Sequence, residues 1–331
     1  MSRGAGCTVR IAPLAEAAAR DAYAALHAAS PQRTAFAGLA FADAACAAFG
    51  LTGRLALGRD AEGEVLIGAV LFEKRTGPFR QLVVPPLTPY TGPLLAADVG
   101  LGSAAAVRDF LAAVARGYAA VAFHLSPAVA DVRPFTWAGF TATPRYTYRG
   151  PSGLGGAPPY VRKMVRENGP VRVDGSTRAT GTATRLDPGA AADVVRAMER
   201  AFARRGEAMP VDPAGAERLV RALVAAGTAR IVVAETERAR VGAVATLADS
   251  RTGHFWAGAG DPGPSMLLMM ATTTESLAAD GVEAFDLVGG NVERISTFKQ
   301  RFGLPLAVHY RVSWTGSRAL RLREALRARR A

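Results

Sequence analysis

One lysine stands out among the residues that could take part in chemistry. The chain has 40 Lys and Arg residues, and only three of them are lysines. Lys299 lies between two predicted strands, flanked by Phe298 and Phe302. Because the chain almost always uses arginine, a lysine here indicates that the position requires the compact charge of an ammonium group. Arg294 and Arg301 could contribute to the same positive pocket, and the alternative for all three cations is a solvated loop.

Other candidate residues are acids, a tyrosine and two histidines. Asp286 ends a predicted strand and Glu293 follows closely. Either could accept a proton from an attacking amine, or serve only as a capping or salt-bridging acid. Tyr90 lies between two proline-containing turns and is either a substrate-cleft wall or a packed turn residue. His254 and His309 lie on predicted strands, where we expect histidines that are satisfied within the sheet.

The positive charge is concentrated in two segments. The formal net charge is +12, and residues 145–185 and 317–331 supply nearly all of it. Within the first segment, Arg162, Lys163 and Arg166 fall on about one helical turn and could grip a diphosphate or an RNA backbone. Basic patches suit a phosphate-rich partner such as tRNA, a nucleotide-linked substrate or coenzyme A. The alternative is a solvated helix face and a frayed tail.

Several classes of protein are disfavoured by the composition. Cys7 and Cys46 form no CxxC pair, so neither a disulfide framework nor a metal site is expected. No GxSxG or Cys–His motif indicates a covalent nucleophile. No run of eighteen apolar residues predicts a membrane span, and the first residues lack the apolar core of a secretory signal. We therefore expect a cytoplasmic protein.

The predicted elements occur twice in the same order. Helices are expected over 13–29, with Pro13 at the start, and near 41–49, followed by three strands, a helix at about 103–117 and a strand pair. The second half repeats helices, three strands, a helix from an N-cap at Ser265 and further strands. The fold class is therefore α+β, with two similar lobes, each a mixed, mostly antiparallel sheet flanked by helices. The Gly/Pro-rich join gives a first domain over 1–150, a second over 151–316 and a basic tail over 317–331.

Three segments resemble one protein family. They are PPLTPYTGPLL at 85–95, the Lys/Arg-rich helix YVRKMVREN at 160–168 and GGNVERISTFKQRFG at 289–303. Together with the repeated lobe they resemble the Fem-type (FemAB/FemX) proteins, built from two tandem GNAT (acetyltransferase)-like domains. That family includes the peptidoglycan interpeptide-bridge enzymes, which take amino acids from aminoacyl-tRNA, and relatives in natural-product pathways. The resemblance implies that Lys299 binds substrate phosphate or stabilises the developing oxyanion.

The sequence also departs from acetyl-CoA enzymes in one loop. At the place of their pyrophosphate-binding loop stands GAGDPGPSMLL, residues 258–268, where Asp261 is negative and Pro262 and Pro264 lack N–H donors. No basic residue occurs in this segment, so a standard coenzyme A site is disfavoured. The long helical insertion of many tRNA-using bridge enzymes is also missing from 160–314.

These observations predict an acyltransferase without a bound cofactor. We expect it to form an amide by moving an aminoacyl group from aminoacyl-tRNA, as co-substrate, to a small-molecule or nucleotide-linked amine such as a cell-wall precursor or a natural-product intermediate. The alternatives are an acyl-CoA N-acyltransferase and a non-catalytic binding protein. The expected catalytic residues are Lys299, Asp286 and Glu293. The expected substrate-binding residues are Tyr90, Arg294, Phe298, Arg301 and Phe302.

Overall fold

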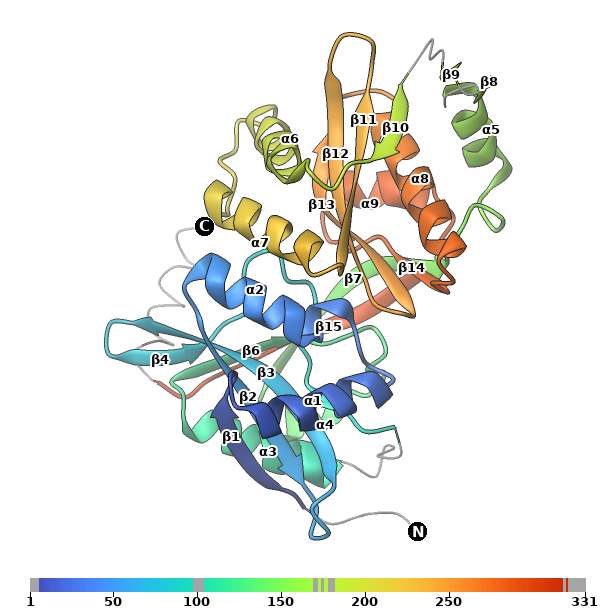
Figure 1. Cartoon of the computed structure of the whole chain (residues 1–331). Coiled ribbons are helices and arrows are strands. Elements are labelled where there is room, and N and C mark those ends of the chain that lie inside the picture. The colour runs from blue at the N-terminus through green and yellow to red at the C-terminus, as the bar shows by residue number, and fades with distance from the viewer. Residues whose placement is uncertain are drawn as a thin grey trace. The chain divides into compact units, whose positions relative to one another are not determined.

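A computed structural model describes residues 6–97, 104–168, 172–173, 176–177, 182–317 and 320. The chain forms two compact units (Figure 1). The first contains residues 1–145 and 308–331, and the second contains 146–307. The division differs from the linear one expected above, because the last strand is grouped with the first unit.

The first unit is a sheet with helices packed against it. Its strands lie in the order β1-β2-β3-β4-β6-β15, and β5 pairs with β3. The strands are β1 (Thr8–Pro13), β2 (Thr52–Arg59), β3 (Val65–Thr76), β4 (Phe79–Leu82), β5 (Leu94–Leu95), β6 (Ala120–His124) and β15 (Leu306–Thr315). The helices are α1 (Ala17–Ala29), η1 (Ala35–Ala37), α2 (Leu39–Phe49), α3 (Ala104–Arg116) and α4 (Arg133–Trp137). Pro13 ends β1, so its expected place at a helix start was wrong.

The second unit repeats this arrangement. Its strands lie in the order β7-β14-β13-β12-β11-β10. They are β7 (Thr141–Pro151, from residue 146 in this unit), β10 (Ala183–Leu186), β11 (Ala229–Glu235), β12 (Arg240–Ala248), β13 (Thr252–Gly260) and β14 (Ala284–Asp286). The helices are α5 (Pro159–Asn168), α6 (Ala191–Ala203), α7 (Pro213–Ala225), α8 (Ser265–Ala279) and α9 (Glu293–Gln300), and β8 (Arg172–Val173) pairs with β9 (Ser176–Thr177).

Each unit buries one face of its helices against the sheet. In the first unit, the apolar stripe of α3, which includes Phe110 and Leu111, packs into a cluster with Phe123 of β6. In the second unit, Met269 of α8 packs with Phe285 of β14 in the corresponding cluster. In α3 the apolar residues share a face because residues three and four apart lie on the same side of a helix. The predicted fold class, a mixed and mostly antiparallel sheet with flanking helices used twice, is confirmed.

The one parallel strand pair in each unit, among the strands described, is very short. In the second unit β13 and β14 pair only from Thr252↔Ala284 to His254↔Asp286. In the first unit β4 and β6 pair only at Gln81↔Ala120 and Leu82↔Val121. Beyond these pairs the two parallel strands separate, and we call the place where they separate the fork. Each unit has a cavity next to its fork.

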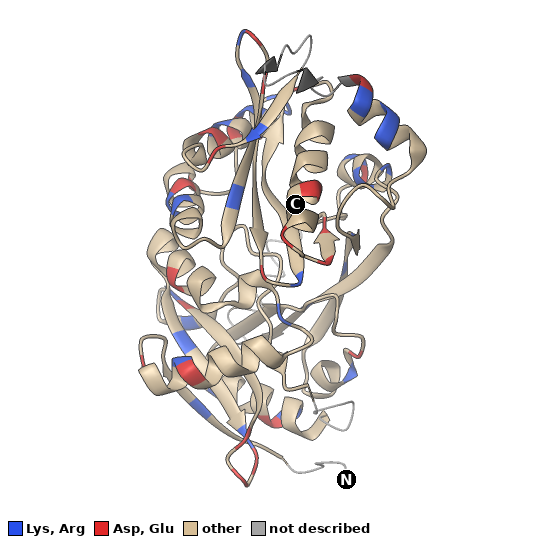
Figure 2. Ribbon diagram, turned by 45° about the vertical axis from the view of Figure 1, so that its right-hand side comes forward, with Lys and Arg blue, Asp and Glu red and all other residues tan. Residues whose placement is uncertain are grey.

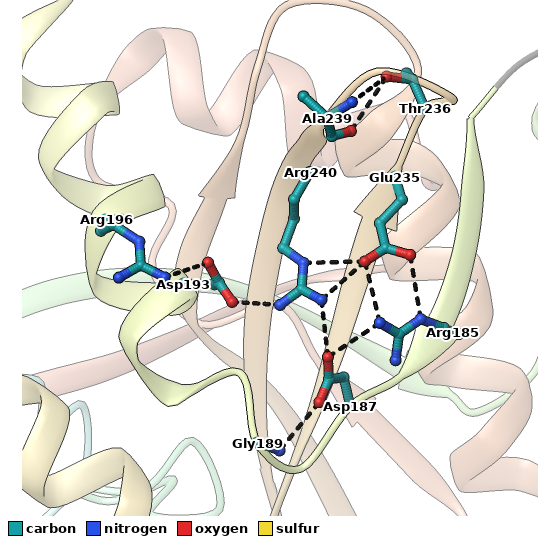
Figure 3. Close-up of polar contacts among 9 residues, drawn as sticks. All are labelled: Arg185, Asp187, Gly189, Asp193, Arg196, Glu235, Thr236, Ala239 and Arg240. Atoms are coloured by element: carbon teal, nitrogen blue, oxygen red, sulfur yellow. Dashed lines mark hydrogen bonds and ion pairs between the residues drawn. The ribbon is translucent and has the colours of Figure 1, made fainter.

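An ion network holds the outer strands of the second unit to α6. Arg240 of β12 bonds to Glu235 of β11, to Asp187 and to Asp193 of α6 (Figure 3). Arg185 of β10 joins the same network through Glu235, at 3.1 Å. The guanidinium groups hold the pKa of Glu235 below its usual range through hydrogen bonds and charge. The network therefore links three strands of the sheet, β10, β11 and β12, to the helix α6 that covers them.

Candidate active site

A cavity of about 410 Å³ lies at the fork of the second unit. One wall is the second half of β13, from Phe255 to Gly260, and another is the inner side of α9. The remaining lining residues come from α6 and the turn after it, from β12 and from the first turn of α8, namely Ala201, Arg205, Val244 and Met266. Its size is within the range of small-molecule sites.

The cavity exists because β13 and β14 separate at a bulge. Ala245 of β12 pairs with Ala257 and Thr246 pairs with Phe255, so Trp256 is an extra residue in β13. Such a bulge bends its strand and ends regular pairing. On the other side, Val288 has a φ of 48° and Gly289 a φ of 78°, which turns the chain away from β14 toward α9. Positive φ is rare for a β-branched residue, so this turn is strained.

The open edge of β13 presents backbone groups toward the fork. The N–H of Asp261 donates to the carbonyl of Val241 at 2.7 Å, across from β12. Since strand residues alternate, the peptide groups of Gly258 and Gly260 point away from β12. The Gly260 carbonyl accepts from Arg204 at 3.0 Å, which agrees with this direction. Gly258 has a φ of 137° and a Cβ there would lie 2.2 Å from the Ala243 carbonyl oxygen, so only glycine fits.

Lys299 lies on α9 and lines the cavity. Its ammonium group donates to the backbone carbonyls of Leu287 at 2.6 Å and Gly289 at 2.8 Å, and to that of Val288. An ammonium has three hydrogens, so these contacts use all of its donors. Burial lowers the pKa of Lys299 to about 8, although the charge of Asp286 opposes the shift.

Asp286 is fully buried behind the turn that Lys299 holds. Its carboxylate accepts from the Thr147 hydroxyl at 2.6 Å and from the Val288 N–H at 2.8 Å, and His254 Nδ1 lies 3.7 Å away. Burial alone would raise the pKa of Asp286, but the neighbouring His254, together with the hydrogen bonds from Thr147 and Val288, holds it at about 2. A buried, ionised carboxylate of this kind organises the turn.

The other predicted residues of the late motif have different surroundings. Arg294 and Phe298 line the cavity with Lys299. Phe302 is buried and packs edge-on against Phe298, with ring centroids 5.5 Å apart. Glu293 and Arg301 are exposed at opposite ends of α9 and are not among the residues that line the cavity. The structure therefore brings together Lys299, Arg294 and Phe298.

The remaining predicted residues are not among those that line this cavity. Tyr90 is buried in the first unit, edge-on to Phe36 and to His309. Most of the charged residues of α5 are basic, as the blue segments of its ribbon show (Figure 2), and here Lys163 pairs with Glu167 at 3.7 Å and Arg162 bonds to the carbonyl of Gly155. Arg166 is exposed on the same helix. Apart from residues 317 and 320, the basic tail lies outside the described residues.

Sequence reasoning missed a group of arginines beside the loop that precedes α8. Asp261 pairs with Arg204 at 2.8 Å and with Arg200 at 3.5 Å. The segment 258–268 itself contains no basic residue, but α6 supplies two from about sixty positions earlier in the chain. The predicted cap at Ser265 was wrong: Pro264 is the cap, and the Ser265 hydroxyl donates to the Asp261 carbonyl at 2.9 Å.

The first unit has a cavity of about 620 Å³ at its own fork, with a different character. Polar groups line it, including Gln81, Thr88, Thr143, Arg311 and Ser313. His124 also lines it, with Nδ1 3.2 Å from the Thr88 carbonyl, and burial lowers the pKa of this histidine to about 4. The two forks thus share a position in the lobe but differ in chemistry.

Comparisons with known proteins agree with this architecture. Residues 160–300 match the model of an acetyltransferase (GNAT) domain. No curated protein sequence matches significantly. Among solved structures, FemX has a TM-score of 0.62 at 13% identity, over 88% of this chain and 95% of that one. A tandem GNAT protein from the clavulanic acid biosynthesis pathway has a TM-score of 0.56 at 10% identity, over 94% and 99%. L-PGS from Bacillus licheniformis has a TM-score of 0.54 at 12% identity, over 97% and 98%.

The chain thus has a tandem GNAT-like fold, and it shares the fold of the FemX structure over most of its length. Its fold is similar to that of FemX, as the sequence motifs indicated, and the acetyltransferase (GNAT) domain over residues 160–300 indicates an acyltransferase. In the part of the chain that the structure describes, no helix is both long and apolar enough to cross a membrane.

Proposed function

We propose that the second unit forms an amide at its fork cavity, by moving an acyl group from an activated ester or thioester to an amine. The observation that carries this proposal is the open edge of β13, where Gly258 and Gly260 present peptide groups beside the cavity. An N–H donor fixed by the sheet can stabilise the oxyanion that forms when nitrogen adds to the carbonyl carbon. The bond from carbon to the leaving oxygen or sulfur then breaks, and the amine proton passes to solvent or to the leaving group.

Lys299 has a positioning role in this proposal. Because its three donors already bind the turn after β14, the ammonium sets where that wall of the cavity lies. Its positive charge still lies beside the reacting carbonyl and favours a developing negative charge. Asp286 acts from the buried side of the same turn. Arg294, at the exposed side of the cavity, is the cation best placed to meet a donor phosphate.

Aminoacyl-tRNA is the donor that we propose first, which would make the reaction cytoplasmic. The loop before α8 offers few phosphate ligands, because the N–H of Asp261 is bonded to Val241 and two of the next three residues are prolines. The exposed basic side of α5, with Lys163 and Arg166, suits an RNA backbone. The acceptor would be a small-molecule or nucleotide-linked amine.

An acyl-CoA donor is the second candidate, and one observation favours it. Arg200 and Arg204 lie beside the loop at the start of α8. The surroundings of this loop are therefore more basic than its own sequence indicates. The tandem GNAT protein of the clavulanic acid biosynthesis pathway, which has a similar fold, was solved without AcCoA.

Transfer of a labelled acyl group separates the two donors. The protein is incubated with a pool of ¹⁴C-aminoacyl-tRNAs and an amine-containing small-molecule extract, and base-stable labelled amide is measured. Product that disappears when the tRNA is first digested with RNase supports the tRNA donor. Product formed instead from ¹⁴C-acetyl-CoA or ¹⁴C-octanoyl-CoA supports the second candidate. Turnover of neither donor contradicts the proposed function.

A further inference from the structure

The fork cavity of the second unit is more apolar than acyl transfer alone requires. Six of its side chains are large and hydrophobic, and they come from four different elements: Val244, Phe255, Trp256, Met266, Ile295 and Phe298. From these walls we infer that the transferred acyl group carries a neutral, apolar body, such as a leucyl or phenylalanyl side chain or a medium-length acyl chain. This inference rests on the proposed function, since it names the acyl group of that reaction.

Small residues create the space for such a group. Ala201 of α6 and Ala257 and Ala259 of β13 line the cavity where larger side chains would fill it. A glycyl or acetyl group would leave most of the 410 Å³ without contacts. Apolar atoms gain free energy in proportion to the water-exposed area they lose, so a larger acyl group would bind more tightly.

The charges around the cavity disfavour a cationic acyl group. The side chains that line it include Arg205, Arg294 and Lys299 but no Asp or Glu from the described part of the chain. A lysyl side chain would therefore bring a fourth positive charge to a wall with no carboxylate, which is unfavourable.

Arg205 and Lys299 already have partners within the protein, so they do not favour an acidic acyl group either. Arg205 bonds to Glu207 at 2.8 Å and to the Ala201 carbonyl at 2.7 Å, and its guanidinium stacks over Phe202. Lys299 is held by the three carbonyls described above. Of the three cations that line the cavity, Arg294 alone is exposed. Its charge therefore faces solvent and not the apolar interior of the cavity.

Binding of donor analogues tests this inference without knowledge of the acceptor. The probes are 3′-aminoacylamino-3′-deoxyadenosines that carry leucine, phenylalanine, glycine, lysine or glutamate, together with octanoyl-CoA and acetyl-CoA. Dissociation constants are measured by calorimetry on the full chain. Each buried methylene is expected to tighten binding about four-fold. The leucyl and phenylalanyl probes, or octanoyl-CoA, should therefore bind at least about ten-fold more tightly than their glycyl, lysyl or acetyl counterparts.

Two variants locate the preference in this cavity. Ala201→Phe should fill the space and remove the advantage of the large apolar probes, whereas Ala203→Phe, on the exposed end of the same helix, should not. Ile295→Glu adds a carboxylate to the wall and should improve lysyl binding relative to leucyl binding. Val292→Glu, exposed and outside the lining, is its matched control.

The possible outcomes separate the two proposals. Measurable binding in which the glycyl or lysyl probe equals the leucyl probe overturns the apolar inference and leaves the proposed function intact. Binding of none of these probes overturns the proposed function, and the inference with it. If Ala201→Phe fails to fold, the charge change at Ile295, which lines the cavity and is 39% exposed, still decides the matter.

Discussion

Lys299 donates a hydrogen bond to the backbone carbonyl of Leu287 at 2.6 Å, which ties the last turn of α9 to the residue directly after β14. Two further carbonyls of the same turn receive the remaining hydrogens of the ammonium group. The turn includes Val288 in a positive-φ conformation, which costs free energy by itself. A single side chain therefore stabilises the strained wall of the cavity.

Replacement of Lys299 should damage both stability and transfer. Lys299→Met leaves three carbonyls without their charged donor, and we expect the free energy of unfolding to fall by about 1–3 kcal/mol. Lys299→Arg should not restore transfer, because a planar guanidinium cannot donate to three converging carbonyls. Lys74→Met, at an exposed lysine of the first unit, is the control. Full transfer activity in Lys299→Met would contradict the positioning role.

Asp286 should contribute stability that depends on pH. Its pKa is about 2 in the folded protein, below the ordinary aspartate value of 3.8, so the ionised form is favoured by folding. This contribution, about 2 kcal/mol, is complete above the unfolded pKa and is lost as the pH falls through the folded pKa. Urea unfolding at pH 7, 4 and 3 should show that Asp286→Asn is less stable at pH 7 and that the difference shrinks below pH 4. A constant difference would refute this account.

Gly258 should be intolerant of even the smallest side chain. A Cβ at this position meets the backbone of β12 at 2.2 Å and φ is positive, so Gly258→Ala should lower the free energy of unfolding by about 1–3 kcal/mol or more. The same substitution at Gly156, where a Cβ meets no atom within 4 Å, should have little effect. Thermal unfolding of the two variants provides the comparison, and equal melting temperatures would show that the edge of β13 can adapt.

Arg240 should stabilise the second unit through charge. Arg240→Met removes the shared partner of Asp187, Asp193 and Glu235, and the loss should be about 1–2 kcal/mol because these groups are only partly exposed. The deficit should become smaller at high salt, which weakens the repulsion among the acids that remain. Arg196→Met, which removes one exposed pair with Asp193, should cost far less. Chemical denaturation at low and high salt measures both, and similar losses for the two variants would argue against the network.

Periodic elements were predictable from the sequence, and short or long-range features were not. The apolar spacing in α6 and α7 predicted those helices because the pattern is local. The short helix α9 was missed because the sequence motif that contains Lys299 has no apolar stripe long enough to indicate one. For the same reason, the sequence showed Lys299 to be unusual but not that its donors turn toward backbone carbonyls.

The arginines beside Asp261 illustrate a second limit. Arg200 and Arg204 are ordinary helix residues in the sequence, and only the packing of α6 on β13 brings them to the loop. Likewise, the last strand follows the second unit in the chain but pairs with β6, at Val312↔Phe123 for example. Contacts between residues so far apart in sequence leave no local pattern.

The position of β15 has a practical consequence for dissecting the molecule. A fragment that stops before this strand would leave β6 as an exposed edge with unpaired backbone groups, a common cause of aggregation. A simple internal cut of the gene would therefore yield an incomplete first unit, whereas the second unit, residues 146–307, is continuous in the chain. A circular permutation that moves residues 308–317 ahead of the first strand would be needed to isolate the first unit as one continuous polypeptide.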